Sequence, residues 1–195
     1  MRYFMTFSYD GSDFQGYQKQ PRQRTIQKEL EDALKQINGG EAVSVCASGR
    51  TDAGVHALNQ KAHFDMKVKI TCDKLLKGLN SLLPEDIYVK KIDEVADDFH
   101  ARFNAIGKEY VYKINMGEYS PIERKYCYQY NKNLDVVAIE RGLKYFEGEH
   151  NFKSFTKAND EIEDYVRTIS QTSIIRDPKD INKLIITFVG TGFMR

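Results

Sequence analysis

Residues 25–40 read TIQKELEDALKQINGG and carry the clearest signal for the fold. The apolar positions repeat at helical spacing, at Ile26, Leu30, Ala33, Leu34 and Ile37. This period predicts an amphipathic helix with one face turned to a core. Thr25 is a favourable N-cap residue, and Gly39 and Gly40 are typical of a helix end.

Further elements are expected on both sides of this helix. Residues 3–9 alternate between apolar and polar side chains and predict a strand. After the helix we expect short strands at 43–47 and 60–66, a helix from Thr71 to Pro84, and a strand at 87–92. The resulting order, β-α-β-β-α-β, is typical of the ferredoxin-like (RRM-like) unit, an antiparallel sheet with helices on one face.

The second half of the chain begins in the same way. We expect a long strand at 104–116, a helix from Asp135 to Gly148, and strands at 167–176 and 183–190. Residues 156–164 are polar and acidic and predict a loop. A last helix and strand do not follow, so we expect an α+β chain of two ferredoxin-like domains, 1–100 and 101–195, of which the second lacks its C-terminal helix and strand.

Composition excludes several other classes. Of the 195 residues, 41% are hydrophobic, which is not typical of a disordered chain. No run approaches the ~18 apolar residues of a membrane span, and the N-terminus does not resemble a signal peptide. The three scattered cysteines fit a reducing cytoplasm, and the four histidines lack metal-ligand spacing, so we expect no metal site.

Charge alone does not identify a partner. The formal net charge is +1, from 29 basic and 28 acidic residues, which does not by itself indicate a nucleic-acid-binding protein. A local basic stripe could still bind one, and basic residues are concentrated in one early segment, at Lys19, Arg22, Arg24 and Lys28. On charge alone, a solvated face is the simpler explanation of the same residues.

Residues 47–57, ASGRTDAGVHA, place Arg50 and Asp52 between two expected strands. An Arg–Asp pair could brace a hairpin turn, and glycines here could also cradle a phosphate, although the lysine and serine of a P-loop are absent. Asp52 could act with His56 in a hydrolase, but no GxSxG elbow is present. Alternatively, Asp52 is a covalent nucleophile, and Arg50 enters a nucleic-acid stem in place of a flipped base.

Seven segments in order along the chain resemble the bacterial tRNA pseudouridine synthase A family. They are YDGSDFQGYQKQ (9–20), RTIQKELEDAL (24–34), SGRTDAGVHA (48–57), NSLLPEDI (80–87), FHARFNAIGKEYVY (99–112), GEHNFKSF (148–155) and GTGFMR (190–195). The resemblance therefore covers both predicted domains. SGRTDAGVHA is similar to the catalytic segment of that family almost letter for letter.

The resemblance implies an isomerase that converts uridine to pseudouridine in tRNA. In bacterial members the targets are positions 38, 39 and 40 of the anticodon arm. It also implies a cytoplasmic homodimer with no cofactor or metal, and a catalytic cleft between two ferredoxin-like halves whose sheets lie side by side.

The same resemblance implies roles for individual residues. Asp52 is the expected nucleophile, Arg50 pairs with it and supports base flipping, and Tyr110 lies against the flipped uracil. The expected substrate-binding residues are Gly16, Gln18, Gln20, Arg22, Arg24, Thr51, His56 and Arg102. Asp52 could attack C1′, attack C6 or assist elimination at the sugar, and the sequence does not choose among these routes.

Two other functions compete with this interpretation. The chain could be an inactive RNA-binding module, but such a module would not require Asp52 within an intact GRTDAG segment. It could also be a small-molecule hydrolase that uses Asp52 and His56. That alternative leaves the glutamine- and arginine-rich segment at 15–24 unexplained.

Overall fold

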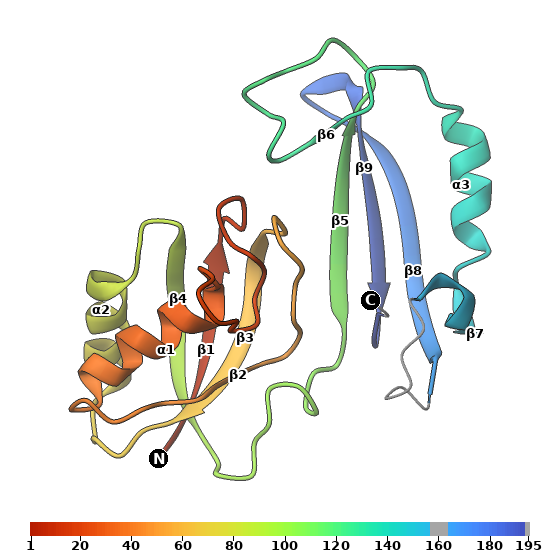
Figure 1. The fold of residues 1–195 in the computed structure, drawn as a ribbon. Coiled ribbons are helices and arrows are strands. Elements are labelled where there is room, and N and C mark those ends of the chain that lie inside the picture. The colour runs from red at the N-terminus through yellow and green to blue at the C-terminus, as the bar shows by residue number, and fades with distance from the viewer. Residues whose placement is uncertain (157–163, 194–195) are drawn as a thin grey trace. The chain divides into compact units, whose positions relative to one another are not determined.

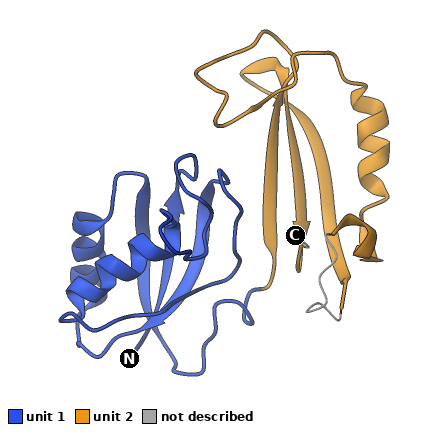
Figure 2. Cartoon of the chain, in the orientation of Figure 1, with its two compact units in different colours: residues 1–105 blue, residues 106–195 orange. Residues whose placement is uncertain are grey.

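The computed structural model describes residues 1–156 and 164–193, which form two compact units, Met1–Ala105 and Ile106–Arg195 (Figure 2). The expected domain boundary was at residues 100 and 101. The units divide slightly later, and Phe99 and Ala101 contact the sheet of unit 1. Within the described residues, no helix combines the length and the apolar character needed to cross a membrane.

Unit 1 has the predicted β-α-β-β-α-β order. Its elements are β1 (Arg2–Tyr9), α1 (Ile26–Ile37), β2 (Val45–Ala47), β3 (Ala57–Asp65), α2 (Cys72–Leu82) and β4 (Ile87–Val95). The strands form one antiparallel sheet in the order β2-β3-β1-β4. Helices α1 and α2 lie side by side on one face of this sheet (Figure 1). This is the ferredoxin-like arrangement predicted from the sequence.

The core of unit 1 lies between the sheet and the two helices. Alternate residues of β1, including Tyr3, Met5 and Phe7, are fully buried. They pack with buried leucines of α1 and α2, namely Leu30, Leu34, Leu75 and Leu79. The alternation of β1 and the helical period of α1 therefore place apolar side chains in the same layer.

Thr25 and Thr71 occupy the N-cap positions of α1 and α2, as predicted. Neither threonine side chain accepts the hydrogen bond that usually accompanies such a cap. The hydroxyl of Thr25 is buried and has no hydrogen-bond partner among the described residues. At the other end of α1, Gly39 and Gly40 both have positive φ, which explains why two glycines follow the helix.

The chain that follows β4 crosses the other face of the unit 1 sheet. The ring of Phe99 contacts Phe4 edge-on at 4.9 Å, and Arg2 donates a hydrogen bond to the carbonyl of Phe99. The backbone N–H of Ala101 donates to Nδ1 of His63 on β3. The N–H of Asn104 donates to the carbonyl of His100 in a turn, and the strand expected from residue 104 begins only at Lys108.

Unit 2 contains β5 (Lys108–Asn115), β6 (Tyr128–Gln129), α3 (Val136–Lys144), β7 (Gly148–Asn151), the 3-10 helix η1 (Lys153–Phe155), β8 (Val166–Asp177) and β9 (Asp180–Gly190). The sheet order is β6-β5-β9-β8-β7, and only the short β5–β6 pair is parallel. Strands β5, β8 and β9 with α3 correspond to the expected β-α-β-β order. The sequence pattern did not predict β6, β7 or η1. Most of the loop expected at 156–164 lies outside the described residues.

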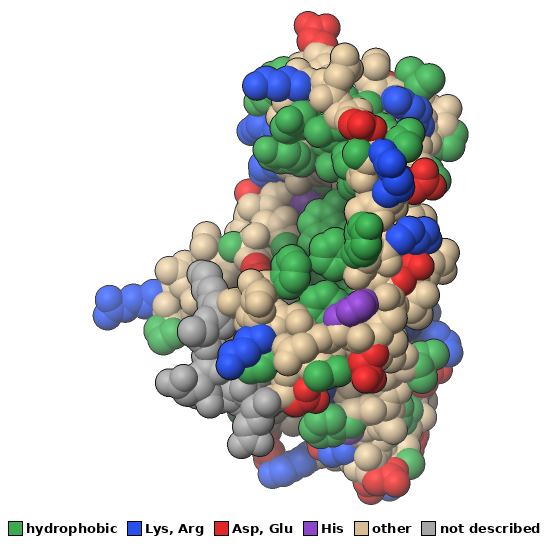
Figure 3. Space-filling view, turned by 90° about the vertical axis from the view of Figure 1, so that its right-hand side faces the viewer, with side chains coloured by type: hydrophobic (Ala, Val, Ile, Leu, Met, Phe, Trp, Pro, Cys, Tyr) green, Lys and Arg blue, Asp and Glu red, His purple; other side chains and the backbone are tan. Residues whose placement is uncertain are grey.

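Aromatic rings pack together in unit 2. Phe146 lies within 6.5 Å of the rings of Phe152, Phe155 and Phe188, and Phe188 also contacts Tyr112. Hydrophobic side chains are gathered in the middle of the face drawn in Figure 3. Phe155 and Tyr112 are exposed, so this cluster is less enclosed than the core of unit 1.

Leu79→Ala tests the packing of unit 1. Leu79 is fully buried, so truncation should lower the free energy of unfolding of unit 1 by about 2–5 kcal/mol. Hydrogen exchange of unit 1 amides across a urea series measures this change. Leu82→Ala in the same helix is the control, because Leu82 is 43% exposed and its truncation should cost less than about 1 kcal/mol. Equal losses in both variants would contradict the assigned core.

Candidate active site

Asp52 and Arg50 lie on the loop that joins β2 to β3, and both residues are exposed. This loop, residues 48–56, stands at the end of the sheet where β1 ends. Tyr9, the last residue of β1, pairs with Ala57 of β3 on one side and with Ile87 of β4 on the other. The loop that follows β1 and the turn that precedes β4 therefore reach the same end of unit 1.

Gln60 fixes the first part of loop 48–56. Its side-chain oxygen accepts a hydrogen bond of 2.9 Å from the hydroxyl of Ser48, and its amide nitrogen donates to the carbonyl of Gly49 at 3.0 Å. The backbone N–H of Ser48 also donates to the carbonyl of Lys61. The backbone immediately before Arg50 is thus held by β3.

Thr51 is held through both its side chain and its backbone. Its hydroxyl shares a hydrogen bond of 2.8 Å with the hydroxyl of Tyr9, and its carbonyl accepts from the N–H of Tyr17 at 3.0 Å. Burial raises the pKa of Tyr9, partly offset by hydrogen bonds from Thr51 and Gln60. Tyr9 therefore remains a neutral phenol that holds the residue next to Asp52.

Two glycines let the first loop, residues 10–25, lie directly on loop 48–56. Gly16 has φ +89°, and a β-carbon there would lie 2.9 Å from the carbonyl oxygen of Thr51. A β-carbon on Gly11 would overlap the carbonyl oxygen of Val55. The N–H of Gly54 also donates to the carbonyl of Phe14. The two loops are therefore packed backbone to backbone around Asp52.

His56 connects the end of loop 48–56 to the start of the first loop. Its Nδ1 lies 3.0 Å from a carboxylate oxygen of Asp10 and 3.2 Å from the backbone nitrogen of Gly11. Nδ1 donates to Asp10 when it carries a proton and accepts from Gly11 when it does not. In either form Nδ1 of His56 is hydrogen-bonded to the first loop.

The polar residues expected to bind substrate differ in their surroundings. Gln18, Gln20 and Arg22 are exposed, and the side chain of Gln20 donates to the carbonyl of Gln15. Arg22 has a positive φ of 59°. Arg24 is different, because its guanidinium is bound by the carboxylate of Asp86 at 2.7 and 2.9 Å.

The two remaining expected site residues lie outside these loops. Arg102 is an exposed residue of unit 1, and its guanidinium lies 5.9 Å from the ring centroid of Phe103. Tyr110 lies in β5 of unit 2, where its ring contacts Phe193 edge-on at 4.7 Å. The structure thus brings together the expected residues of the first loop and of loop 48–56. Arg102 contacts an aromatic ring of unit 1, and Tyr110 contacts an aromatic ring of unit 2.

Three positioning side chains were missed by the sequence analysis: Tyr9, Gln60 and Asp86. Tyr9 and Asp86 do fall inside quoted family-like segments, at 9–20 and 80–87, and that overlap was an available signal. Gln60 had no such signal, because its role follows only from its place on β3 beside the loop.

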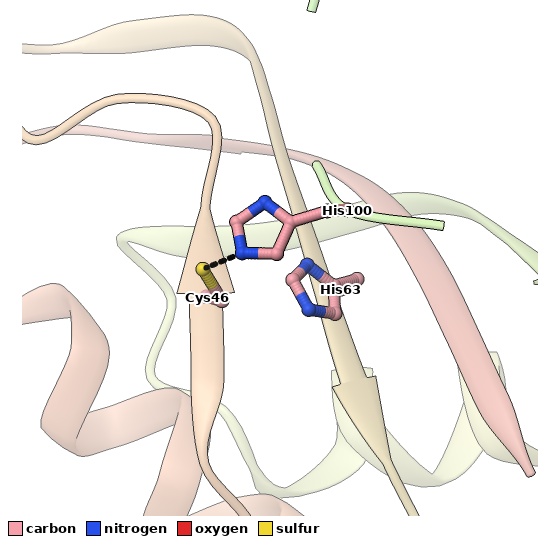
Figure 4. Close-up of side chains that lie close together, drawn as sticks. All are labelled: Cys46, His63 and His100. Carbon is pink, nitrogen blue, oxygen red and sulfur yellow. Dashed lines mark hydrogen bonds between the residues drawn. The ribbon is translucent and has the colours of Figure 1, made fainter. Parts of the chain in front are cut away.

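Cys46 of β2, His63 of β3 and His100 face one another on unit 1 (Figure 4). Their donor atoms all lie within 4.8 Å of one another, so the cluster could be considered as a metal site. However, Nδ1 of His63 accepts from the N–H of Ala101, and Nδ1 of His100 accepts from the N–H of Arg102.

Those hydrogen bonds indicate which ring nitrogen carries the proton in each neutral histidine. A neutral ring whose Nδ1 accepts a hydrogen bond carries its proton on Nε2. A metal-bound histidine usually shows the reverse, with Nε2 on the metal and Nδ1–H as a donor. The cluster therefore fits a hydrogen-bonded network, in which Nε2–H of His100 donates to Sγ of Cys46 at 3.6 Å, better than it fits a metal ion.

The fold and the site define an α+β protein with a ferredoxin-like first unit and an exposed aspartate on a loop held by hydrogen bonds. Comparison with known proteins identifies its family. The family model described as tRNA pseudouridine synthase matches residues 5–104 and 143–195. The chain belongs to this family of isomerases, as the sequence analysis predicted.

Individual relatives agree with this assignment. The chain is 43% identical over 194 residues to "tRNA pseudouridine synthase A" of Latilactobacillus sakei, an alignment that covers 99% of this chain and 78% of the relative. It is 44% identical to the protein of the same name from Geobacillus sp., with 97% and 75% covered. The Listeria monocytogenes protein of that name is 43% identical, with 99% and 77% covered.

The network around His63 predicts a pH dependence of stability. Burial, followed by His100 and Arg2, lowers the pKa of His63. Its folded pKa is thus below its unfolded value of about 6.5, so the unfolded state binds more protons as the pH falls below that value. The stability of unit 1 should therefore decrease as the pH falls from about 6.5 through the folded pKa.

Urea denaturation at several pH values measures this effect. His63→Gln should weaken the acid-side decrease relative to the unchanged protein, because glutamine does not titrate and can still accept a hydrogen bond. His150→Gln is the control, since His150 is an exposed residue of unit 2 and should leave the decrease intact. The interpretation fails if both variants behave alike.

Proposed function

We propose that the chain converts uridine to pseudouridine in the anticodon arm of tRNA, with Asp52 as the nucleophile. The observation that carries the proposal is the combination of an exposed Asp52 with a backbone held on both sides, at Thr51 and Gly54. Membership of the tRNA pseudouridine synthase family supports the same reaction. The relatives are named as synthases that act on tRNA.

The reaction rearranges bonds without adding or removing atoms. The C1′–N1 bond breaks, the uracil turns, a C1′–C5 bond forms, and the C5 proton is finally lost while N1 gains one. Asp52 attacks C1′, attacks C6 or assists elimination at the sugar, and all three routes need a carboxylate at a fixed place. The tight packing of the first loop on loop 48–56 supports such preorganisation.

Arg50 and Tyr110 have supporting roles in this proposal. Arg50 is exposed two residues before Asp52, and its planar guanidinium suits the space left in a stem by a flipped base. Tyr110 supplies an aromatic ring against the detached uracil, where stacking is worth ~1–3 kcal/mol per base. Thr51 and His56 act mainly through the backbone of the loops that they hold together.

Other parts of the proposal follow from the family resemblance. The target positions are 38, 39 and 40 of the anticodon arm, and the enzyme works as a homodimer in the cytoplasm. The exposed side chains of Gln18, Gln20 and Arg22 in the first loop, and of Arg102, contact the RNA. Gly16 acts by allowing the first loop to approach Asp52.

Asp52→Ala tests the nucleophile. Without the carboxylate, pseudouridine formation should fall by roughly 10³-fold or more, while the affinity for tRNA should change little. Carbodiimide adduct mapping of anticodon-arm uridines measures the product. Asp32→Ala is the control, because Asp32 is an exposed aspartate of α1 that pairs with Lys28. Product formation by the Asp52 variant at the rate of the control would refute the assignment.

Arg22→Asn tests the RNA-binding role of the first loop. Asparagine removes the charge but tolerates the positive φ of this position. If Arg22 contacts a phosphate, the slope of log K against log salt should become shallower by roughly 0.7–0.9. Binding to an anticodon stem-loop over a salt series measures the slope. Lys74→Gln on α2 should leave it unchanged, and an unchanged slope for Arg22→Asn would remove this residue from the RNA surface.

A further inference from the structure

Arg24 was expected to bring positive charge to the RNA, but its guanidinium is directed at the protein. Two of its nitrogens donate to the two carboxylate oxygens of Asp86, at 2.7 and 2.9 Å. Its Nε lies 3.5 Å from Glu29. The guanidinium carbon lies 4.0 Å from the ring centroid of Phe14, in cation–π geometry. The hydrogen bonds to Asp86 are also the main cause of the raised pKa of Arg24.

Asp86 holds both ends of the first loop. Its carboxylate binds Arg24 near the end of the loop, and its backbone carbonyl accepts a hydrogen bond of 3.0 Å from the N–H of Asp10 at the start. The loop is also closed on itself, because the N–H of Gln15 donates to the carbonyl of Arg24 at 2.9 Å. A single residue in the turn before β4 therefore ties the start of the loop to its end.

The contact continues from this loop to Asp52. Phe14, whose ring lies under the Arg24 guanidinium, is only 1% exposed. Its carbonyl accepts a long hydrogen bond of 3.4 Å from the N–H of Gly54, two residues after Asp52. On the other side, the N–H of Tyr17 donates to the carbonyl of Thr51, the residue before Asp52. The first loop thus supplies a hydrogen bond on each side of the aspartate.

We infer that Asp86 and Arg24 are positioning residues, which hold the first loop so that its backbone places the Asp52 carboxylate for reaction. This inference rests on the proposed function of Asp52. The chain of contacts runs from Asp86 through Arg24 and Phe14 to Gly54. Arg24 acts on catalysis through this chain and is not a phosphate ligand.

Two simpler roles predict different results. If Arg24 were a phosphate ligand, its replacement would weaken tRNA binding and its salt dependence. Asp86→Asn would then tighten binding, because it removes a negative charge beside a cation. If the pair were only a surface ion pair, its loss would have a small effect on stability and none on the rate, since its side chains are 37% and 26% exposed.

The experiment measures three quantities for Asp86→Asn and Arg24→Lys. They are the single-turnover rate of pseudouridine formation at saturating enzyme, the Kd for tRNA, and the melting temperature. Both variants should reduce the rate by roughly 10-fold to 100-fold, the scale expected for a misplaced catalytic group, with Kd nearly unchanged. Arg24→Lys keeps the positive charge, so its defect would report the lost two-point geometry.

Asp65→Asn is the matched control. Asp65 also binds an arginine of the same unit through both carboxylate oxygens, which accept from Nε and Nη2 of Arg2 at 2.9 and 2.8 Å. Arg2 begins β1, however, whereas the first loop follows the end of that strand. The control should therefore lose a comparable ion pair and keep the full rate. Combining Arg24→Lys with Asp86→Asn should add little to either single defect, as expected for residues that act as one unit.

Several outcomes would overturn the inference. A full rate in Asp86→Asn, with Asp52→Ala inactive, would refute the positioning role and leave the proposed function intact. Equal rate losses in Asp86→Asn and Asp65→Asn would show general destabilisation only. An active Asp52→Ala would refute the proposed function itself. If Asp86→Asn folds poorly, hydrogen exchange of the Gly54 amide in Arg24→Lys decides, because unchanged protection there would contradict the inference.

Discussion

The close approach of two backbones, at Gly11 and Gly16 on one side and at Val55 and Thr51 on the other, is the constraint on which the site depends. Any side chain at either glycine would push the first loop away from loop 48–56. Because the loops touch through backbone atoms, the hydrogen bonds from Tyr17 to Thr51 and from Gly54 to Phe14 can form. Gly11 and Gly16 therefore provide contact rather than flexibility, although glycines in a loop would also be typical of a mobile turn.

The sequence predicted unit 1 well because its pattern and its topology agree. The periods of β1 and α1 point to the same core, and the β-α-β-β-α-β order allows few arrangements. Unit 2 was predicted less completely. Strand β6 has only two residues, and β7 is exposed along its length, so neither has the alternation that identifies a strand. The start of β5 was placed too early, because Asn104 closes a turn onto His100, whose neighbour Ala101 is hydrogen-bonded to the sheet of unit 1, a tertiary contact that local pattern does not contain.

The candidate site was also predicted only in part. The motif containing Arg50 and Asp52 could be recognised, since it is continuous in sequence. The residues that hold it come from β1, β3 and the turn before β4, and no local pattern joins them. Arg24 shows the consequence for charge. It adds to a basic segment in the sequence, yet Asp86, 62 residues away, neutralises it in the structure. Lys19 is similarly paired with Glu31 and Lys28 with Asp32, so three of the four cations of that segment are bound by carboxylates.

The contrast between the backbone and the side chain of residue 52 explains how one loop can serve this chemistry. The proposed reaction requires a carboxylate that reaches an extruded nucleotide, so the side chain of Asp52 must be exposed. It also requires that the carboxylate does not reorganise during the reaction, because fixed groups stabilise charge better than mobile ones. Loop 48–56 satisfies both requirements, since Asp52 is exposed while its neighbours Thr51 and Gly54 are hydrogen-bonded to the first loop. A buried aspartate would be as well fixed but could not reach RNA, and an aspartate on an unsupported turn could reach RNA without a fixed position.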